Sequence, residues 1–583
     1  MIVVFSFFFI TALVGAITYY FVRNDQYKTA EDFFLASRGL HWTVVTGSIM
    51  LTNLSAKHLV STNGLGYKEG LVTAGWEVLS AIACALTAIH FLPTFWAAKV
   101  ATTPEYLKKR FDQRTYTTVC VFFLLGGILE EMPAAVYSGA VAFDQIFDIQ
   151  KQLGWEGDWG KFAVLSVISW CTGLLGAIYS LVGGLKAVAI SDTINGVGLF
   201  IAGLSVPILG FSYIGNGNIS EGATILYSRN KGKFNMIGGP ESTIPYPAIF
   251  VGMPVIQMYY WCMQQVVLQR ILSARNLRHG QKATVAAGFL KVFVPWIIVL
   301  PGIIAFHILR EKGIVLSGNS DEAYPALLKI ILPEWSMGLY GAVIIGAVLS
   351  TFNSNLNTIA QMVTMDIYKV LVEPDASEET LFKVARNVGI ACGGFTLCLA
   401  PFFMFTPAAY AFLVSVNGLW NAPVVAIFVC ATIDFSWFGC RISCNHLRPG
   451  AAHACSVVAP IVFTLLRWVL PACFEGATIH SLYVTGIAGI SGILTMLVHG
   501  MFWPLKEAEV QAMLTLMQKD SDYEILRDSY LEMTEVDSQD ADKGSVSDDV
   551  DDTPNAYDDP WTWANRGAAF ITLLAILQFV WFH

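Results

Sequence analysis

Charged residues are scarce in this 583-residue sequence. Asp, Glu, Lys and Arg make up only 14% of the residues, whereas 55% are hydrophobic and the mean hydropathy is +0.56. A soluble globular protein carries roughly 25% charged residues, so this chain lacks the charge to cover a water-exposed surface. The composition therefore argues against a soluble protein, and we expect no nucleic-acid partner.

Long apolar runs recur from one end of the chain to the other. Each run of about 18–30 residues can cross a hydrocarbon core of roughly 30 Å, and the ten-residue alternation of transmembrane strands is missing. We therefore predict an all-α polytopic membrane protein with 14 transmembrane helices. They are expected at approximately residues 2–22, 42–61, 71–94, 115–145, 162–182, 187–213, 246–273, 284–309, 336–365, 384–404, 406–434, 451–474, 482–504 and 562–582.

Lysine and arginine in the short loops predict the orientation, because cytoplasmic loops carry an excess of both. The loops after the odd-numbered spans hold more of them than the alternate loops. We therefore expect a multi-pass protein of the plasma (inner) membrane with both termini extracellular or periplasmic. The segment 505–561 would then be cytoplasmic, and its 17 Asp and Glu against 4 Lys and Arg carry little weight in orientation.

Ionisable side chains lie inside several of the apolar runs. A charge at the centre of a transmembrane helix costs about 2.5–3.5 kcal/mol on insertion scales, so such side chains usually face an interior cavity. Any one of them can be a structural hydrogen-bonding device, but the group indicates a solute or ion pathway. Its members are Lys57, His58, Glu77, Glu130, Glu131, Asp192 and Lys291.

Two spans, five helices apart, also look interrupted. In MLTNLSAKHLV, the side chains of Asn53 and Ser55 can bond to nearby backbone and loosen a helix. In AIFVGMPVIQMYYW, Gly252 and Pro254 interrupt the run, and proline removes a backbone donor and clashes with the preceding turn. Two broken spans in corresponding positions predict an inverted-repeat secondary transporter, in which unwound carbonyls coordinate a cation beside the solute near the midplane.

A third stretch, GAVIIGAVLSTFNSNLNTIAQ, combines close packing with oxygen ligands. Its Gly and Ala residues allow helices to approach closely, while Ser350, Thr351, Asn353 and Ser354 could bind a hard cation. Hydroxyl groups in membrane helices more often bond back to their own helix. Four polar residues within five positions nevertheless favour an ion site here.

These residues resemble a known family. The stretches MLTNLSAKHLV, GWEVLSA, GGLKAVAISDTINGVGL, YYWCMQQVVLQRILSARN, FLKVFVPWIIVLPG and AVLSTFNSNLNTIAQMVTMDIYK are similar to the sodium/glucose cotransporter (SGLT) branch of the sodium:solute symporter family. The similarity covers roughly residues 25–435, with the six motifs in family order. It implies sodium-driven sugar uptake by alternating access, with sodium as the co-transported ion.

The resemblance also implies a division of the chain around a LeuT-like core. That core has a five-plus-five inverted repeat in which the first helix of each repeat is discontinuous. The expected parts are an extra N-terminal helix and linker (1–41), the ten-helix transport core (42–434), two accessory helices (435–504), the acidic cytoplasmic loop (505–561) and a C-terminal helix (562–583).

Carried over residue by residue, the resemblance implies two sites. The main sodium site falls on the carbonyls of Leu51, Leu54 and Ala347 and the hydroxyls of Ser350 and Thr351. The sugar contacts fall on Asn53, His58, Glu77, Ser80, Gln257, Trp261 and Lys291, and Tyr260 matches an inner gate tyrosine. In some members an aspartate matching Asp192, with hydroxyls at the positions of Asn353 and Ser354, forms a second sodium site. Because Asn353 replaces the usual hydroxyl, we do not assume two ions.

Two features depart from the family pattern. Ser415 stands where the family has a sugar-binding glutamine, so Asn417 or Asn421 would have to supply the amide. Charges not expected from the family stand at Lys57, Glu130 and Glu131, and we predict that Lys57 pairs with Glu130 or Glu131 because the spans that carry them should be neighbours.

The residue types suit a sugar, whose hydroxyl groups all need partners when buried. A carboxylate substrate would favour an arginine, and we expect none in the cavity segments. One alternative is a proton-coupled or uncoupled permease for a sugar, an inositol or another small polar solute. Another is a membrane solute sensor with 505–561 as its effector platform. The sequence contains no HExxH and no compact nucleophile–base motif, so we do not predict an enzyme. It leaves open the identity of the sugar, the sodium stoichiometry and the oligomeric state.

Overall fold

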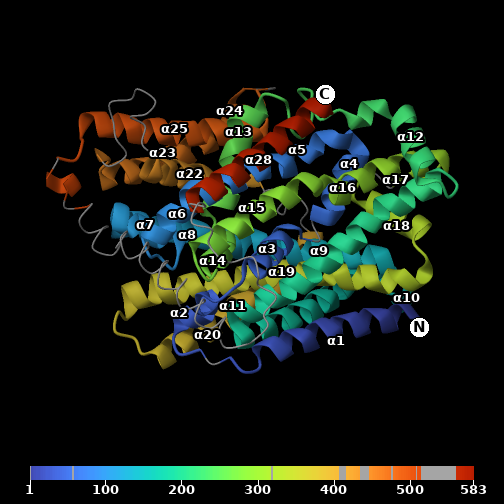
Figure 1. The fold of residues 1–583 in the computed structure, drawn as a ribbon, viewed down its shortest axis with the longest axis horizontal. Coiled ribbons are helices and arrows are strands. Elements are labelled where there is room, and N and C mark those ends of the chain that lie inside the picture. Colours follow the sequence, from blue (N-terminus) through green and yellow to red (C-terminus); the bar gives the residue numbers. More distant parts are fainter. Residues whose placement is uncertain are drawn as a thin grey trace.

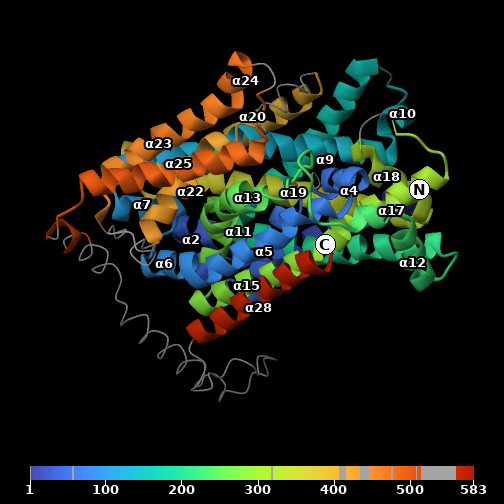
Figure 2. The same ribbon diagram turned by 90° about the horizontal axis from the view of Figure 1, so that it is seen from above.

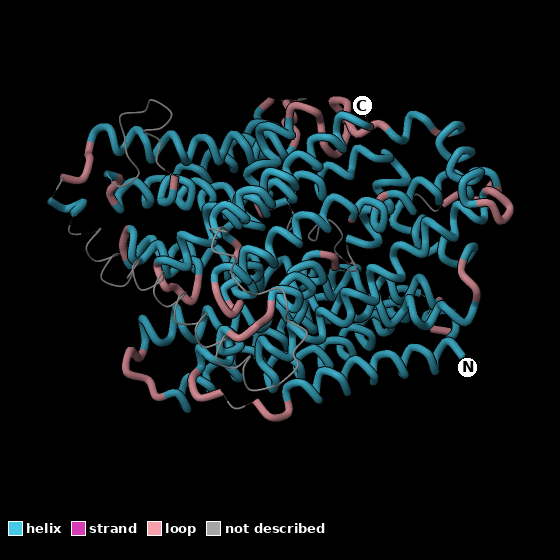
Figure 3. Tube along the Cα trace, in the orientation of Figure 1, coloured by secondary structure: helices cyan, strands magenta, loops and turns pink. Residues whose placement is uncertain are grey.

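The computed structural model describes the chain over most of its length. The described residues are 2–25, 27–55, 58–155, 157–316, 320–405, 415–433, 446–474, 477–506, 508–511, 513 and 560–582. Over these residues the chain is helical, and the one bridge recorded between extended segments joins Leu40 to Ala274 (Figure 3). The prediction of an all-α protein is confirmed for this part of the chain.

The helices of the first half run from α1 to α12. Their bounds are α1 Ile2–Val22, α2 Ala30–Leu35, α3 Trp42–Asn53, α4 Asn63–Glu69, α5 Gly75–Leu86, α6 Leu92–Ala97, α7 Thr103–Arg110, α8 Gln113–Gly126, α9 Met132–Phe147, α10 Ile149–Leu153, α11 Gly157–Ile214 and α12 Ile219–Arg229.

The helices of the second half run from α13 to α28. Their bounds are α13 Ala248–Met258, α14 Gln265–Leu272, α15 Leu277–Phe293, α16 Pro295–Ile298, α17 Leu300–Glu311, α18 Ala323–Ile331, α19 Met337–Gln361, α20 Glu378–Leu399, α22 Gly418–Thr432, α23 Pro449–Thr464, α24 Leu470–Cys473, α25 Ser481–Phe502 and α28 Pro560–Trp581.

Nine helical stretches among the described residues are long and apolar enough to cross a membrane. A tenth counts if the bent pair Leu277–Phe293 and Pro295–Glu311 is one span. The chain is therefore a polytopic helical membrane protein, while the count of 14 spans and the side on which the termini lie stay predictions. Figure 1 shows both termini toward the end of the molecule that carries α12 and α18.

The predicted break in the first discontinuous span is confirmed. Helix α3 ends at Asn53, Leu54 has φ −80° and ψ 68°, and helical structure resumes at His58 as a π-helical turn that leads into α4. The residues Ala56 and Lys57 between these elements lie outside the described part of the chain.

The second break exists, but the sequence-based position is wrong. Helix α13 runs through Gly252 and Pro254 to Met258, a π-helical turn follows, and the chain leaves the helix only at Gln264, with φ −65° and ψ 126°. A β-carbon at Gly252 would lie 2.0 Å from the carbonyl oxygen of Leu482. Gly252 thus permits close packing of α25, and the helix accommodates the single donor lost at Pro254.

The core of the bundle forms around α19. Nearly every residue of α19 is buried, and it packs against α11, α9, α3 and α1; Figures 1 and 2 show it at the centre of the bundle. Helix α11 folds back on itself at Gly184, where φ is 60°, so it supplies two of the predicted spans. Helices α3 and α14, which flank the two breaks, both contact α19.

Candidate solute and cation site

The break after α3 redirects the backbone hydrogen bonds. In a continuous helix the amides of Ser55 and His58 would donate to the carbonyls of Leu51 and Leu54. Instead the Ser55 amide donates to the Asn53 carbonyl at 2.9 Å, and the His58 amide donates to the Ser55 hydroxyl at 3.3 Å. The carbonyls of Leu51 and Leu54 are thereby released from their usual donors, as a cation site on unwound backbone requires.

Helix α19 brings two hydroxyl groups to the same region. The Thr351 hydroxyl lies 3.5 Å from the Thr52 carbonyl oxygen at the end of α3 and 3.2 Å from the Ala347 carbonyl oxygen. Ser350 lies beside the Asp192 carboxyl, yet its buried Oγ makes no well-oriented hydrogen bond to any described residue. The structure therefore brings Thr351, together with the Ala347 carbonyl, against the broken end of α3, whereas Ser350 lies beside Asp192 of α11.

A buried ion pair lies beside the same break. The Lys291 ammonium on α15 pairs with the Glu77 carboxylate on α5 and donates to Asn53 Oδ1. Its Nζ lies 5.3 Å from the centroid of the Trp261 ring, a cation–π distance. The side chains of Lys291 and Glu77 are only 1% and 5% exposed. Four residues predicted to touch sugar, from four segments of the chain, thus meet at one point.

Three further predicted residues surround this cluster. Tyr260 contacts Asn53 and the Trp261 ring. The Ser80 hydroxyl donates to the Glu77 carbonyl one turn earlier. The Gln257 amide donates to the Trp76 carbonyl at 2.7 Å, which links α13 to the start of α5. Tyr260 therefore touches the cluster, whereas Ser80 and Gln257 hold the backbone of α5 beside it.

The remaining predicted sugar contacts lie further away. The His58 ring is 3.1 Å from the Ser55 hydroxyl, within the broken segment itself. Ser415 and Asn417 lie just before α22, which packs against the turn Tyr259–Met263. Within the described residues, no hydrogen bond joins the Asn417 side chain to Lys291 or Glu77. The part proposed for α22 stays a prediction.

A second buried ion pair contradicts one expectation. Arg270 on α14 is fully buried, so the statement that no arginine lies in the cavity segments is wrong. It donates from Nε to the Ser48 hydroxyl at 2.9 Å and from NH1 to the Val266 carbonyl at 2.7 Å. Its NH2 donates to the Ser354 hydroxyl and lies 3.8 Å from Asp192 Oδ2. The sequence signal that could have predicted this ion pair was Arg270 itself, which lies inside the seventh predicted span.

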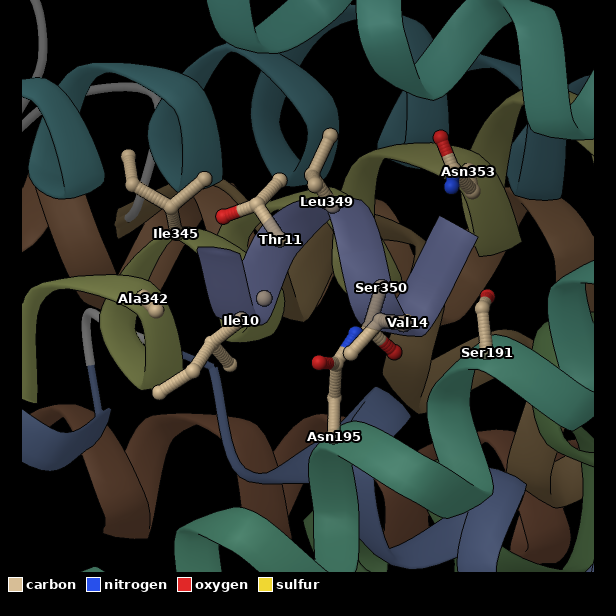
Figure 4. Close-up of a pocket in the computed structure, with 11 residues that line it drawn as sticks. Ile10, Thr11, Val14, Ser191, Asn195, Ala342, Ile345, Leu349, Ser350 and Asn353 are labelled. Carbon is tan, nitrogen blue, oxygen red and sulfur yellow. The ribbon is translucent and has the colours of Figure 1, made fainter. Parts of the chain in front are cut away.

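The three residues considered for a second sodium site point in two directions. Ser354 and Asp192 belong to the Arg270 network, where Asp192 Oδ2 also accepts from the Ser48 hydroxyl at 2.8 Å. Asn353 instead lines a small cavity of about 20 Å³ between α1, α11 and α19, with Asn195 and Ser350. Figure 4 shows this cavity, with Ile10, Thr11 and Val14 of α1 beside it. Ser354 and Asn353 therefore do not converge on one point.

The second break lies beside an acidic residue. The Gln264 side-chain amide donates to Glu131 Oε1. The preceding residue, Glu130, is also buried. The predicted partner of these acids, Lys57, lies outside the described residues. The pairing of Lys57 with Glu130 or Glu131 stays a prediction.

A model of the sodium:solute symporter family matches residues 33–434. The chain belongs to this family. It is 34% identical over 500 residues to the uncharacterized symporter YidK of Escherichia coli K12, covering 86% of this chain and 83% of that protein. It is 30% identical over 425 residues to a Vibrio parahaemolyticus sodium/glucose cotransporter, covering 70% and 76%. It is 27% identical over 533 residues to the human sodium/myo-inositol cotransporter, covering 83% and 71%.

Solved structures agree with the fold. The chain superimposes on a Na⁺-coupled sialic acid symporter in an outward-open state with a TM-score of 0.72 and 22% identity, covering 87% of this chain and 99% of that one. This likeness confirms the LeuT-like fold class. As a member of its family the protein is a transporter rather than an enzyme, and sodium and a small solute are its transported substrates.

Proposed function

We propose that this symporter imports a hexose-like sugar together with sodium by alternating access. The observation that carries the proposal is the contact of Lys291 with Glu77, Asn53 and Trp261 beside the broken end of α3. Relatives named for glucose and for myo-inositol support a polyhydroxylated solute. Myo-inositol is therefore the nearest alternative cargo.

The cluster offers what a ring of hydroxyl groups needs. Glu77 accepts hydrogen bonds, Lys291 donates them, and the Asn53 amide can do both. Trp261 presents an aromatic ring that can cover the apolar face of a sugar. A solute hydroxyl between Lys291 and Glu77 would keep charge-assisted bonds on both sides, so its burial leaves no polar group unpaired.

The sodium ion would bind a short distance away, on the carbonyls of Leu51, Leu54 and Ala347 and the hydroxyls of Ser350 and Thr351. In the sequence, Asn53 lies between Leu51 and Leu54. A cation bound to the carbonyls of these two residues would therefore also hold Asn53, which is a proposed solute contact. The Arg270 guanidinium already neutralises Asp192 and binds Ser354. The proposal therefore rests on one sodium site.

The gradient is sufficient for uphill transport. One cation that crosses about 100 mV gains roughly 2.3 kcal/mol, and a tenfold concentration ratio adds about 1.4 kcal/mol. Together these terms support a several-hundredfold accumulation of solute, on the order of 10² to 10³.

Uptake into proteoliposomes tests the proposal. Radiolabelled glucose, galactose, mannose and myo-inositol are offered with an inward gradient of sodium or of choline. We expect at least one of the hexoses to accumulate only with sodium. Sodium-dependent uptake of myo-inositol without uptake of any hexose would show that myo-inositol is the cargo. Uptake that persists in choline and follows pH would replace sodium coupling with a proton-coupled or uncoupled permease.

A further inference from the structure

A second cavity lies away from the proposed solute site. It measures about 220 Å³, is open to solvent, and lies between α2, α11, α19 and α20. Phe33, Phe34, Tyr27 and Phe382 form its aromatic side, and Ser180, Asn357 and Arg386 contribute polar groups. Phe33 makes edge contacts with the other three rings at centroid distances of 5.4 to 5.8 Å.

The hydrogen bonds around this cavity fix the orientation of the Asn357 amide. The Phe34 carbonyl, which can only accept, lies 2.9 Å from the Gln269 side-chain nitrogen. The same nitrogen therefore also donates to Asn357, at 2.7 Å, and Asn357 must present its oxygen there. Its NH2 group is left buried without a partner among the described residues. The residue is only 1% exposed.

Two more donors line the same cavity. The Ser180 hydroxyl is buried and has no hydrogen-bond partner within the described residues, and the Arg386 guanidinium supplies a positive charge. Glu378, at the start of α20, is directed to α2, where its carboxylate accepts from the Ala30 amide at 2.7 Å. Asn357, Ser180 and Arg386 thus bring an amide, a hydroxyl and a guanidinium to the lining of the cavity, and leaving the two buried donors unpaired is costly.

We propose that this cavity is a binding site for a phosphate group, carried either by a small organic phosphate or by a phospholipid headgroup. A phosphate presents several acceptor oxygens to donors that come from three different helices, and arginine is well suited to binding it. The aromatic side leaves room for the apolar or ring-shaped part of the phosphate's carrier.

The location suggests an effect on transport, and that effect rests on the proposed function. Phe34 and Asn357 both bind Gln269 on α14, which follows the second break. A ligand that fastens α2 to α19 would also hold α14 in place. Because alternating access moves one group of helices against another, phosphate binding would slow the conformational change.

The binding test uses the full chain in dodecyl maltoside micelles, which carry no phosphate, titrated with inorganic phosphate at constant ionic strength. Microscale thermophoresis gives the dissociation constant, and no transport is required. We expect Arg386→Gln and Ser180→Ala each to weaken binding, the first at least about tenfold, as loss of a hydrogen bond to a charged group predicts. Lys383→Gln is the matched control and should stay within about twofold. Lys383 lies on the same helix and is exposed like Arg386, but it pairs with Glu379 and does not line the cavity.

Nanodiscs that contain phosphatidylglycerol distinguish the two sources. If the headgroup is the ligand, the unfolding temperature of the wild type rises in these discs, that of Arg386→Gln rises less, and free phosphate competes poorly. If a small phosphate is the ligand, inorganic phosphate binds equally in the phosphate-free micelles and in the discs. The proposal is overturned if neither probe binds, or if Arg386→Gln and Lys383→Gln give the same dissociation constant.

Discussion

The two buried ion pairs near the first break differ in how firmly the basic side chain is held. Lys291 contacts one carboxylate, one amide oxygen and one aromatic ring. Arg270 uses Nε, NH1 and NH2 to bind two hydroxyl groups and a carbonyl, beside the Asp192 carboxylate. Both pairs join α3 to the second half of the core.

This difference separates a binding group from a structural one. An ammonium is a compact charge on a flexible stem, so Lys291 can exchange a partner for a solute hydroxyl without moving a helix. The planar guanidinium of Arg270 links α3, α11, α14 and α19, and breaking any of these bonds leaves a buried polar group unpaired. We infer that the Lys291 pair serves the solute and that the Arg270 pair positions helices.

The largest effect should come from breaking the Arg270 pair. Arg270→Met leaves the Asp192 charge buried, which costs about 3–5 kcal/mol, so we expect a strongly lowered unfolding temperature and poor expression. Glu311→Gln breaks the exposed pair with Arg229 and should cost less than about 1 kcal/mol. Thermal unfolding in detergent measures both. Equal losses would show that the Arg270 pair does not hold the helices together.

Lys291→Met should affect solute binding more than any exposed lysine does. Loss of a charge-assisted hydrogen bond costs about 1.5–3 kcal/mol, so the KM for the sugar should rise at least about tenfold. Lys329→Met, which removes the exposed partner of Asp148, is the control. Initial uptake rates over a range of sugar concentrations give both values. An unchanged KM in Lys291→Met would remove this residue from the site.

Because α13 continues through Gly252 and Pro254, substitutions at these two neighbouring positions should change stability by different amounts. Gly252→Ala drives a methyl group against the Leu482 carbonyl and should destabilise the protein by about 1–3 kcal/mol. Pro254→Ala leaves α13 helical and should change stability by less than about 1 kcal/mol. Thermal unfolding distinguishes them. A larger effect at Pro254 would mean that proline, after all, shapes this span.

The smallest effect should appear at the sodium hydroxyls. Thr351→Ala removes one ligand, worth about 1 kcal/mol, so the sodium concentration for half-maximal uptake should rise about fivefold. Thr351→Ser keeps the hydroxyl and serves as the control. Uptake over a sodium series measures the change. Identical sodium dependence in wild type and Thr351→Ala would argue against the proposed ligand set.

The sequence predicts a feature of this site when the residues that form it stand out locally, and not when a contact between distant segments forms it. The first break and the charges of Lys291 and Glu77 were accessible because amide and charged residues stand out in apolar runs, where their burial needs a reason. That Asn53 and Trp261 join these charges in one site was implied by the family resemblance. Gln264 could not be found this way. Its departure from the helix coincides with a contact to Glu131, which lies more than a hundred residues away.

The side chains considered for a second sodium site are separated for a geometric reason, and the site itself stays a prediction. Successive residues of a helix point about 100° apart, so Asn353 and Ser354 face different neighbours although they adjoin in the sequence. Ser354 meets Arg270 and Thr52, while Asn353 faces the cavity beside α1. Only the packing of α19 against α3, α11 and α14 decides which face each residue occupies.

The central claim is that cation and sugar share the broken end of α3, and calorimetric binding tests it most directly. The dissociation constant of the transported sugar is measured in sodium and in choline, and that of sodium with and without sugar. Because coupling free energies are reciprocal, we predict that each ligand tightens the other by the same factor, of about fivefold or more. A sugar affinity that is identical in sodium and choline would contradict a shared site.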